Sequence, residues 1–249
     1  MYITRFEKVL EVVRRLLPAG SAIVDLGSAQ GNFSITLAGE TFTVVAVDVR
    51  RSFLQYSALK VSTETERANF NPVVGSALAL PLQDEAFQGV LALEVLEHTT
   101  LPLRLLQEAF RILSPGGAIL VTTPNQKRVT SAATSFSRFT RGEGGVPAFG
   151  DSARGDQHVF EFTPDEVAAT ISQAGFQVQS SEPLVSLLAS PVGWAPRSFV
   201  TTIESATVQL PAALASRLMS TTLVVGHKPL RSPHSNSSVS PGSWRVRPA

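Results

Sequence analysis

The N-terminal segment alternates apolar and charged positions with the period of an α-helix. Apolar side chains recur at steps of three and four residues from Phe6 to Leu17, and charged side chains fill most of the positions between them. Pro18 and Gly20 follow, and both residue types commonly end helices. The pattern therefore predicts an amphipathic helix that packs one face against a core.

Short apolar runs and helical patterns then follow one another along the chain. The runs lack strict alternation, which is typical of parallel strands buried on both faces, and they lie at 21–27, 41–48, 70–76, 87–94 and 118–123. Helical patterns occupy residues 51–61 and 101–113. This repeated order predicts an α/β fold, a Rossmann-like doubly wound and mostly parallel sheet with helices on both faces.

Periodicity fails between residues 126 and 157, and a segment of this length commonly has a function or is disordered. Order returns with the capping box of Thr163, Pro164 and Glu166, which predicts a helix up to Gly175. Two further apolar runs, at 176–183 and 221–229, bring the expected sheet to seven strands. Residues 230–249 are rich in Ser and Pro and contain no acidic residue. We therefore expect one domain at 1–229 and a disordered polar tail at 230–249.

The composition excludes several classes of protein. With 21 basic and 20 acidic side chains the net charge is +1, so a nucleic-acid partner is not expected. The chain has no cysteine, which excludes disulfides, thiolate metal sites and a cysteine nucleophile. Neither a signal peptide nor a span of about 20 apolar residues is evident. We therefore expect a cytoplasmic protein without integral membrane association.

The turn after the first predicted strand is the most informative segment. Gly27 and Gly31 would let a ligand approach the backbone closely. A dinucleotide site prefers G-x-G-x-x-G, but Ala29 and Asn32 stand at the second and third glycine positions. Asp25 precedes the turn, where its charge would repel a pyrophosphate and would suit a ligand that carries an ammonium and a sulfonium.

A second carboxylate ends the next strand. Asp48 follows Asp25 by 23 residues, at a position where a carboxylate can accept hydrogen bonds from both hydroxyls of a ribose. The alternative for Asp48 alone is a helix cap, since Asp is a favoured capping residue. In combination with Asp25 and the two glycines, the ribose interpretation is favoured.

The motifs in their order resemble a known family. The chain carries D-x-G-x-A-x-G at residues 25–31, Asp48, and then GSALALPLQDEAF, LEVLEH and LSPGGAILVTTPN. This series is similar to the class I S-adenosylmethionine methyltransferases of the small-molecule type. LEVLEH and the later QHVFEFTPDEV resemble the O-methyltransferases of quinone biosynthesis and relatives that act on sugars. The resemblance runs from about Ile23 to Asn125.

The resemblance implies a set of cofactor-binding residues. Gly27 and Gly31 would form the turn under the methionine moiety, and Asp25 would hold its amino group. Asp48 would bind the ribose. The complete set implied for S-adenosyl-L-methionine is Asp25, Gly27, Ser28, Gly31, Asp48, Val49, Ser76, Ala77 and Leu93.

Three residues depart from the family pattern. Ala29 replaces the middle glycine of the turn, and its methyl group narrows the approach to the backbone. Ser76 stands where Asp is common, which would remove a strong acceptor for the adenine amino group. Gln88 replaces a frequent Asp at the start of the fourth strand, where we expect a structural role.

Methyl transfer is an in-line displacement from an activated sulfonium, and it requires neither a metal nor a covalent nucleophile. An oxygen acceptor must lose a proton, and His98 and His158 are the candidate bases. We expect O-methylation of a small molecule, with a lid over the acceptor at about 126–158. Two alternatives stay open: N-methylation of a small molecule or nucleobase, and a non-catalytic cofactor-binding protein.

Overall fold

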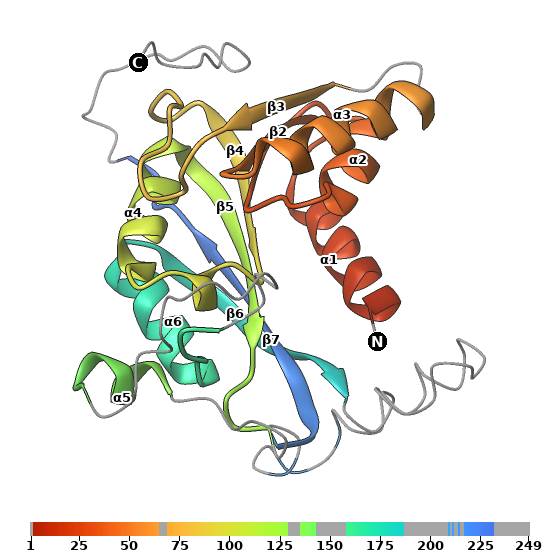
Figure 1. Cartoon of the computed structure of the whole chain (residues 1–249). Coiled ribbons are helices and arrows are strands. Elements are labelled where there is room, and N and C mark those ends of the chain that lie inside the picture. Colours follow the sequence, from red (N-terminus) through yellow and green to blue (C-terminus); the bar gives the residue numbers. More distant parts are fainter. Residues whose placement is uncertain are drawn as a thin grey trace.

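The protein, in a computed structural model, is a three-layer α/β sandwich (Figure 1). The structure describes residues 2–64, 69–128, 135–142, 158–186, 209, 211, 214 and 217–231. A central sheet separates helices α1, α2 and α3 on one face from α4 and α6 on the other. The fold class expected from the alternating pattern is confirmed.

The sheet contains seven strands in the order β3-β2-β1-β4-β5-β7-β6. Their bounds are β1 Ala22–Leu26, β2 Thr43–Asp48, β3 Phe70–Val74, β4 Phe87–Leu93, β5 Leu113–Pro124, β6 Gln177–Ser186 and β7 Met219–His227. Strand β7 is antiparallel to both of its neighbours, β5 and β6. The direction of strand succession reverses between β1 and β4, and such a switch point opens a crevice at the carboxyl ends of the strands.

The helices cover the two faces as their apolar patterns require. They are α1 Tyr2–Leu16, α2 Asn32–Gly39, α3 Arg51–Glu64, η1 Leu96–His98, α4 Pro102–Ile112, α5 Phe136–Thr140 and α6 Pro164–Gln173. Successive residues of β1 enter different cores: Ile23 packs with α1 and α2, whereas Val24 packs with α4 and α6. Helix α6 begins with the expected capping box, in which Thr163 and Glu166 satisfy each other's backbone N–H groups.

Strand β5 differs from the expected strand at 118–123. It begins at Leu113, and its pairing with β4 shifts so that Phe87 faces Leu113 and Gly89 faces Ala118. The Ser-Pro-Gly-Gly segment therefore lies within an irregular first part of the strand, and does not form a separate turn after α4. Gly116, with a φ of +81°, permits this irregularity.

The segments expected as lid and tail are described in part. Helix α5 lies inside the expected lid, where the sequence pattern predicted no element. Residues 129–134 and 143–157 of the lid and 232–249 of the tail lie outside the described residues. At the start of the tail, Arg231 hydrogen-bonds Glu85. Within the described part of the chain, no helix combines the length and apolar character needed to cross a membrane.

Candidate functional site

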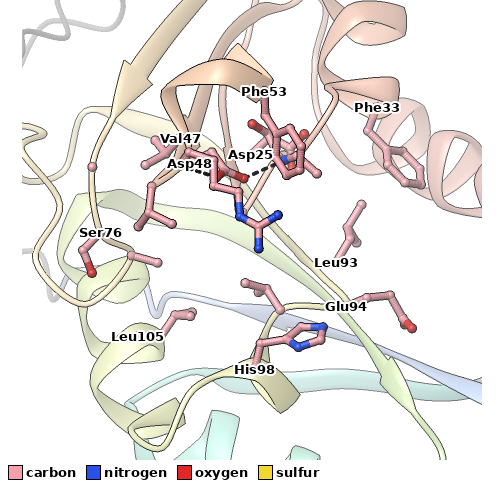
Figure 2. Close-up of a pocket in the computed structure, with 18 of the residues that line it drawn as sticks. Asp25, Phe33, Val47, Asp48, Phe53, Ser76, Leu93, Glu94, His98 and Leu105 are labelled. Atoms are coloured by element: carbon pink, nitrogen blue, oxygen red, sulfur yellow. Dashed lines mark hydrogen bonds between the residues drawn. The ribbon is translucent and has the colours of Figure 1, made fainter. Parts of the chain in front are cut away.

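A cavity of about 660 Å³ opens at the carboxyl ends of the central strands. Its walls come from the loops after β1, β2, β3 and β4, which are the loops that flank the switch point. Eight of the expected cofactor residues line it, namely Asp25, Gly27, Ser28, Asp48, Val49, Ser76, Ala77 and Leu93. Figure 2 shows the two aspartates at one end of the cavity and Glu94 and His98 at the other.

Gly31, the ninth expected residue, does not line the cavity. It has a φ of +75°, and a Cβ there would lie 2.7 Å from the Oγ of Ser57. Glycine is needed at this position because α2 begins against α3, and the reason inferred from the sequence, close approach of a ligand, is not the one seen. Gly27 does line the cavity, and a Cβ on it would lie 2.7 Å from Cγ2 of Val95.

Ala29 occupies the middle position of the turn in a left-handed conformation, with a φ of +47°. Glycine adopts this region without strain, whereas the Cβ of alanine makes it unfavourable. The alanine that replaces the glycine of the family pattern therefore strains the backbone of the turn. The conformation is held by the N–H of Ala29, which donates to Oδ2 of Asp48 at 2.9 Å.

The carboxylate of Asp48 joins two loops of the cavity. Oδ2 accepts from Ala29, and Oδ1 accepts from the N–H of Arg50 at 2.8 Å at the start of α3. Arg50 directly precedes α3, so this bond orders the entry to the helix, but it differs from the helix cap considered as the alternative, in which an N–H of the first helical turn would donate. Neither bond excludes a ligand, because each carboxylate oxygen has a second lone pair. The side chain lines the cavity beside Asp25 (Figure 2).

Asp25 is buried below the turn and still lines the cavity. Burial is the main cause that raises the pKa of its carboxyl group to about 7, and the nearby charge of Asp48 contributes to this rise. Ser34 opposes this shift, because its hydroxyl donates to Oδ2 of Asp25 at 2.5 Å. A cation in the cavity would favour the ionised form of Asp25.

The hydroxyl groups expected near the cofactor have different environments. The Oγ of Ser76 accepts from the N–H of Leu78 at 3.2 Å, so it already supports its own turn. The Oγ of Ser28 is buried and has no hydrogen-bond partner within the described part of the chain.

Gln88 has the structural role expected for it, because its Oε1 accepts from the N–H of Ala22 at 2.9 Å.

An arginine that the sequence did not single out lies at the other end of the cavity. Arg5 of α1 lines the cavity and pairs with Glu94 at 3.1 Å. Glu94 follows β4 and has a φ of +55°, which is rare for a residue with a side chain. Burial raises the pKa of the Glu94 carboxyl group, and the positive charge of Arg5 partly offsets this rise. No pattern links Arg5 to Glu94 in the sequence, since the pair depends on how α1 packs.

The structure brings the two candidate bases together. His98 lines the cavity, and its ring lies 5.2 Å from the ring of His158, centre to centre. His158 is not a lining residue of the cavity. Its Nδ1 lies 3.0 Å from Oε1 of Glu161, which also accepts from Arg128 at 2.6 Å. His98 is therefore the histidine in direct contact with the cavity.

Glu97, an acid that the sequence did not single out, lies close to these histidines. Its side chain is fully buried, Oε2 accepts from Thr123 at 3.3 Å, and Oε1 has no hydrogen-bond partner within the described residues. Burial raises the pKa of Glu97 well above its usual range, and the charge of Glu94 adds to the rise. Glu97, His98 and His158 each offer a ligand atom, and these atoms lie within 4.8 Å of one another.

Comparison with known proteins gives the family. A family model described as a methyltransferase domain matches residues 2–181. The chain is 27% identical over 169 residues to a ubiquinone biosynthesis O-methyltransferase of Xanthomonas axonopodis pv. citri, covering 68% of this chain and 67% of that enzyme. It is 32% identical over 105 residues to a ubiquinone/menaquinone biosynthesis C-methyltransferase of Haemophilus ducreyi, covering 41% of this chain and 40% of that enzyme. The alignments span less than half the length of the first curated relatives, 40% and 46%.

Solved structures share the fold at low sequence identity. The 1,6-didemethyltoxoflavin-N1-methyltransferase of Burkholderia thailandensis, with bound S-adenosylhomocysteine, has a TM-score of 0.59 and 13% identity, covering 90% of this chain and 78% of that one. The [4+2]-cyclase SpnF has a TM-score of 0.62 and 16% identity, covering 90% and 81%. The family model covers most of the chain, and the chain therefore belongs to the methyltransferase domain family, whose methyl donor is S-adenosylmethionine.

Proposed function

We propose that the protein transfers a methyl group from S-adenosylmethionine to a hydroxyl of a small molecule, of the quinone-like, phenolic or sugar type. One observation carries this proposal: a single cavity has Asp25 and Asp48 at one end and His98 at the other. The first end suits a cationic nucleoside, and the second suits an acceptor that must lose a proton. Two of the curated relatives are named as methyltransferases of quinone biosynthesis.

The cofactor would lie across the carboxyl ends of β1 and β2. Asp48 would accept the ribose hydroxyls on its remaining lone pairs, and Asp25 would face the ammonium group. Ser76 and Ala77 would border the adenine, and the Leu93 backbone would lie beside the methionine part. The sulfonium would then point toward the end of the cavity that His98 lines.

The protein would act mainly by alignment and by exclusion of water, because the sulfonium already activates the methyl group. His98 would accept the acceptor proton, because it lines the cavity. Its ring contacts the ring of His158, whose Nδ1 in turn contacts Glu161. The acceptor wall at Leu93-Glu94-Val95 carries no side-chain amide and no aromatic ring to hold an amine or a base, which favours a hydroxyl over a nucleobase amino group. The lid at 126–158 and a cytoplasmic location stay predictions.

The ribose contact is tested by Asp48→Ala. We expect S-adenosylhomocysteine to bind about 10-fold to 100-fold more weakly by calorimetry, a loss of about 1.4–3 kcal/mol for charge-assisted hydrogen bonds. Because Asp48 also supports two loops, the same measurement uses an analogue that lacks both ribose hydroxyls. Removing the hydroxyls should weaken binding to the wild type and leave binding to the variant nearly unchanged. Wild-type binding of NAD without binding of the sulfur cofactor would refute the assignment.

The ammonium contact is tested by the pH dependence of binding. The pKa of Asp25 in the free protein is raised to about 7, so the site binds a proton as the pH falls through 7 and loses its attraction for a cation. Between pH 7.5 and 5.5 the affinity for S-adenosylhomocysteine should fall by up to about 20-fold. Asp25→Asn should bind weakly at both pH values. An equal pH dependence in wild type and variant would assign it to another group.

The role of His98 is tested with an acceptor found by screening phenols, quinols and sugars with isotope-labelled S-adenosylmethionine. His98→Ala should lower turnover by about 10² to 10⁴ while the affinity for S-adenosylhomocysteine stays nearly constant, because the loss concerns the proton. Thr99→Ala, at the neighbouring lining position, is the matched control. If His158→Ala alone gives the large loss, the role belongs to His158. Turnover within threefold of wild type for both histidine variants would remove them from the mechanism.

A further inference from the structure

We propose that Glu97, His98 and His158 form a binding site for a divalent transition-metal ion at the acceptor end of the cavity. The two histidines, treated above as alternative bases, would then be two ligands of one ion. Metal binding itself does not depend on the proposed function. Only the last step, an acceptor hydroxyl coordinated by the ion, rests on it.

The first argument is the geometry of the three side chains. Their ligand atoms lie within 4.8 Å of one another. An ion with bonds of about 2.1 Å separates neighbouring or opposite ligand atoms by roughly 3–4.2 Å, so shifts below about 1 Å would close the site. The backbone already holds the two segments together, because the N–H of Val159 donates to the carbonyl of Glu97 at 2.8 Å.

The second argument is the buried carboxylate. Glu97 is fully buried, and its Oε1 has no hydrogen-bond partner within the part of the chain that the structure describes. A buried oxygen without a partner is costly, and an ion or a water commonly accounts for it. Thr123 donates to the other oxygen, Oε2, and so leaves Oε1 as the ligand atom.

The third argument is the support behind His158. Its Nδ1 lies 3.0 Å from Glu161, so a hydrogen on Nδ1 would donate to this carboxylate and leave the lone pair on Nε2. A histidine ligand is commonly oriented by a carboxylate in this way. Glu161 is itself buried and paired with Arg128 at 2.6 Å, which fixes its position.

The charges around the cluster also favour a cation. Glu94 is paired with Arg5, and Glu161 is paired with Arg128. No ion pair between Glu97 and a lysine or arginine is present among the described residues. A divalent cation would therefore stabilise the ionised form of Glu97 and supply the charge that this carboxylate lacks.

The ligand types indicate the class of ion. Two imidazoles and one carboxylate suit Zn²⁺, Fe²⁺ or Mn²⁺, whereas Mg²⁺ and Ca²⁺ prefer oxygen ligands throughout. Three protein ligands leave a coordination position open, as in catalytic sites. His98 lines the cavity, so this position would face an acceptor hydroxyl and lower its pKa. The ion would then take over the task assigned above to the imidazole of His98.

The test is calorimetric titration of the chelator-treated full-length chain with Zn²⁺, Co²⁺ and Mg²⁺. We expect one Zn²⁺ site of about micromolar affinity or tighter, visible absorption bands from bound Co²⁺, and much weaker Mg²⁺ binding. His98→Ala and His158→Ala should each weaken Zn²⁺ by at least about 100-fold, and Glu161→Gln by about 10-fold to 100-fold. His98 is exposed, so its replacement should leave the packing intact.

The control is His227→Ala, which changes a histidine that contacts Gln179 far from the cluster and should leave Zn²⁺ affinity unchanged. S-adenosylhomocysteine affinity, measured on the same samples, should stay constant in all variants. Its loss would concern the proposed function and not the metal site. Absence of a Zn²⁺ or Co²⁺ site, equal affinity in the wild type and in both His98→Ala and His158→Ala, or preference for Mg²⁺ would each overturn the proposal.

Discussion

The arrangement of the cofactor end of the cavity depends on the carboxylate at the end of β2. Asp48 accepts the N–H of Ala29 from the loop after β1 and the N–H of Arg50 at the start of α3. Its backbone carbonyl accepts the N–H of Gly75 from the loop after β3 at 3.1 Å. Two loops that are distant in sequence, those after β1 and β3, are thus tied to the loop after β2 by one residue. The left-handed backbone at Ala29, unfavourable by itself, is held by the same carboxylate.

The two ends of the cavity differ in how their acidic side chains are paired. At the cofactor end, Asp25 lies beside Asp48, and neither carboxylate forms an ion pair with a lysine or arginine among the described residues, so both can face a cationic ligand. At the acceptor end, Glu94 and Glu161 are each paired with an arginine, and Glu97 lies buried close to His98 and His158. This division suits a reaction in which a positive donor meets an acceptor that loses a proton.

The sequence predicted the sheet and one end of the cavity well, because both depend on local signals. Apolar runs and a capping box at Thr163 are readable within a few residues, and the glycine turn lies next to Asp25. The acceptor end depends on long-range packing. Arg5 reaches Glu94 only because α1 packs against the sheet, and His158 comes close to Glu97 because the N–H of Val159 donates to the carbonyl of Glu97, 62 positions away. A single sequence contains no signal for such contacts, so the grouping of Glu97 with the two histidines was not anticipated.

At Gly31 the structure requires glycine for a reason that the sequence did not indicate. The turn pattern selected it as part of the ligand contact, but the structure requires glycine there because α2 and α3 meet at Ser57. Ser28 does line the cavity, and its buried hydroxyl has no hydrogen-bond partner among the residues that the structure describes. Side-chain surroundings of this kind follow from tertiary packing and not from the spacing of a motif.

The proposed function requires that the cavity at the carboxyl ends of β1, β2 and β4 binds S-adenosylmethionine with its reactive sulfur toward His98. A crystal structure of the full-length chain with S-adenosylhomocysteine tests it most directly. We expect the ribose hydroxyls on the carboxylate of Asp48, the amino group near Asp25, and the sulfur facing the part of the cavity that His98 lines. A bound molecule in another location, or one with its ribose away from Asp48, would contradict the account.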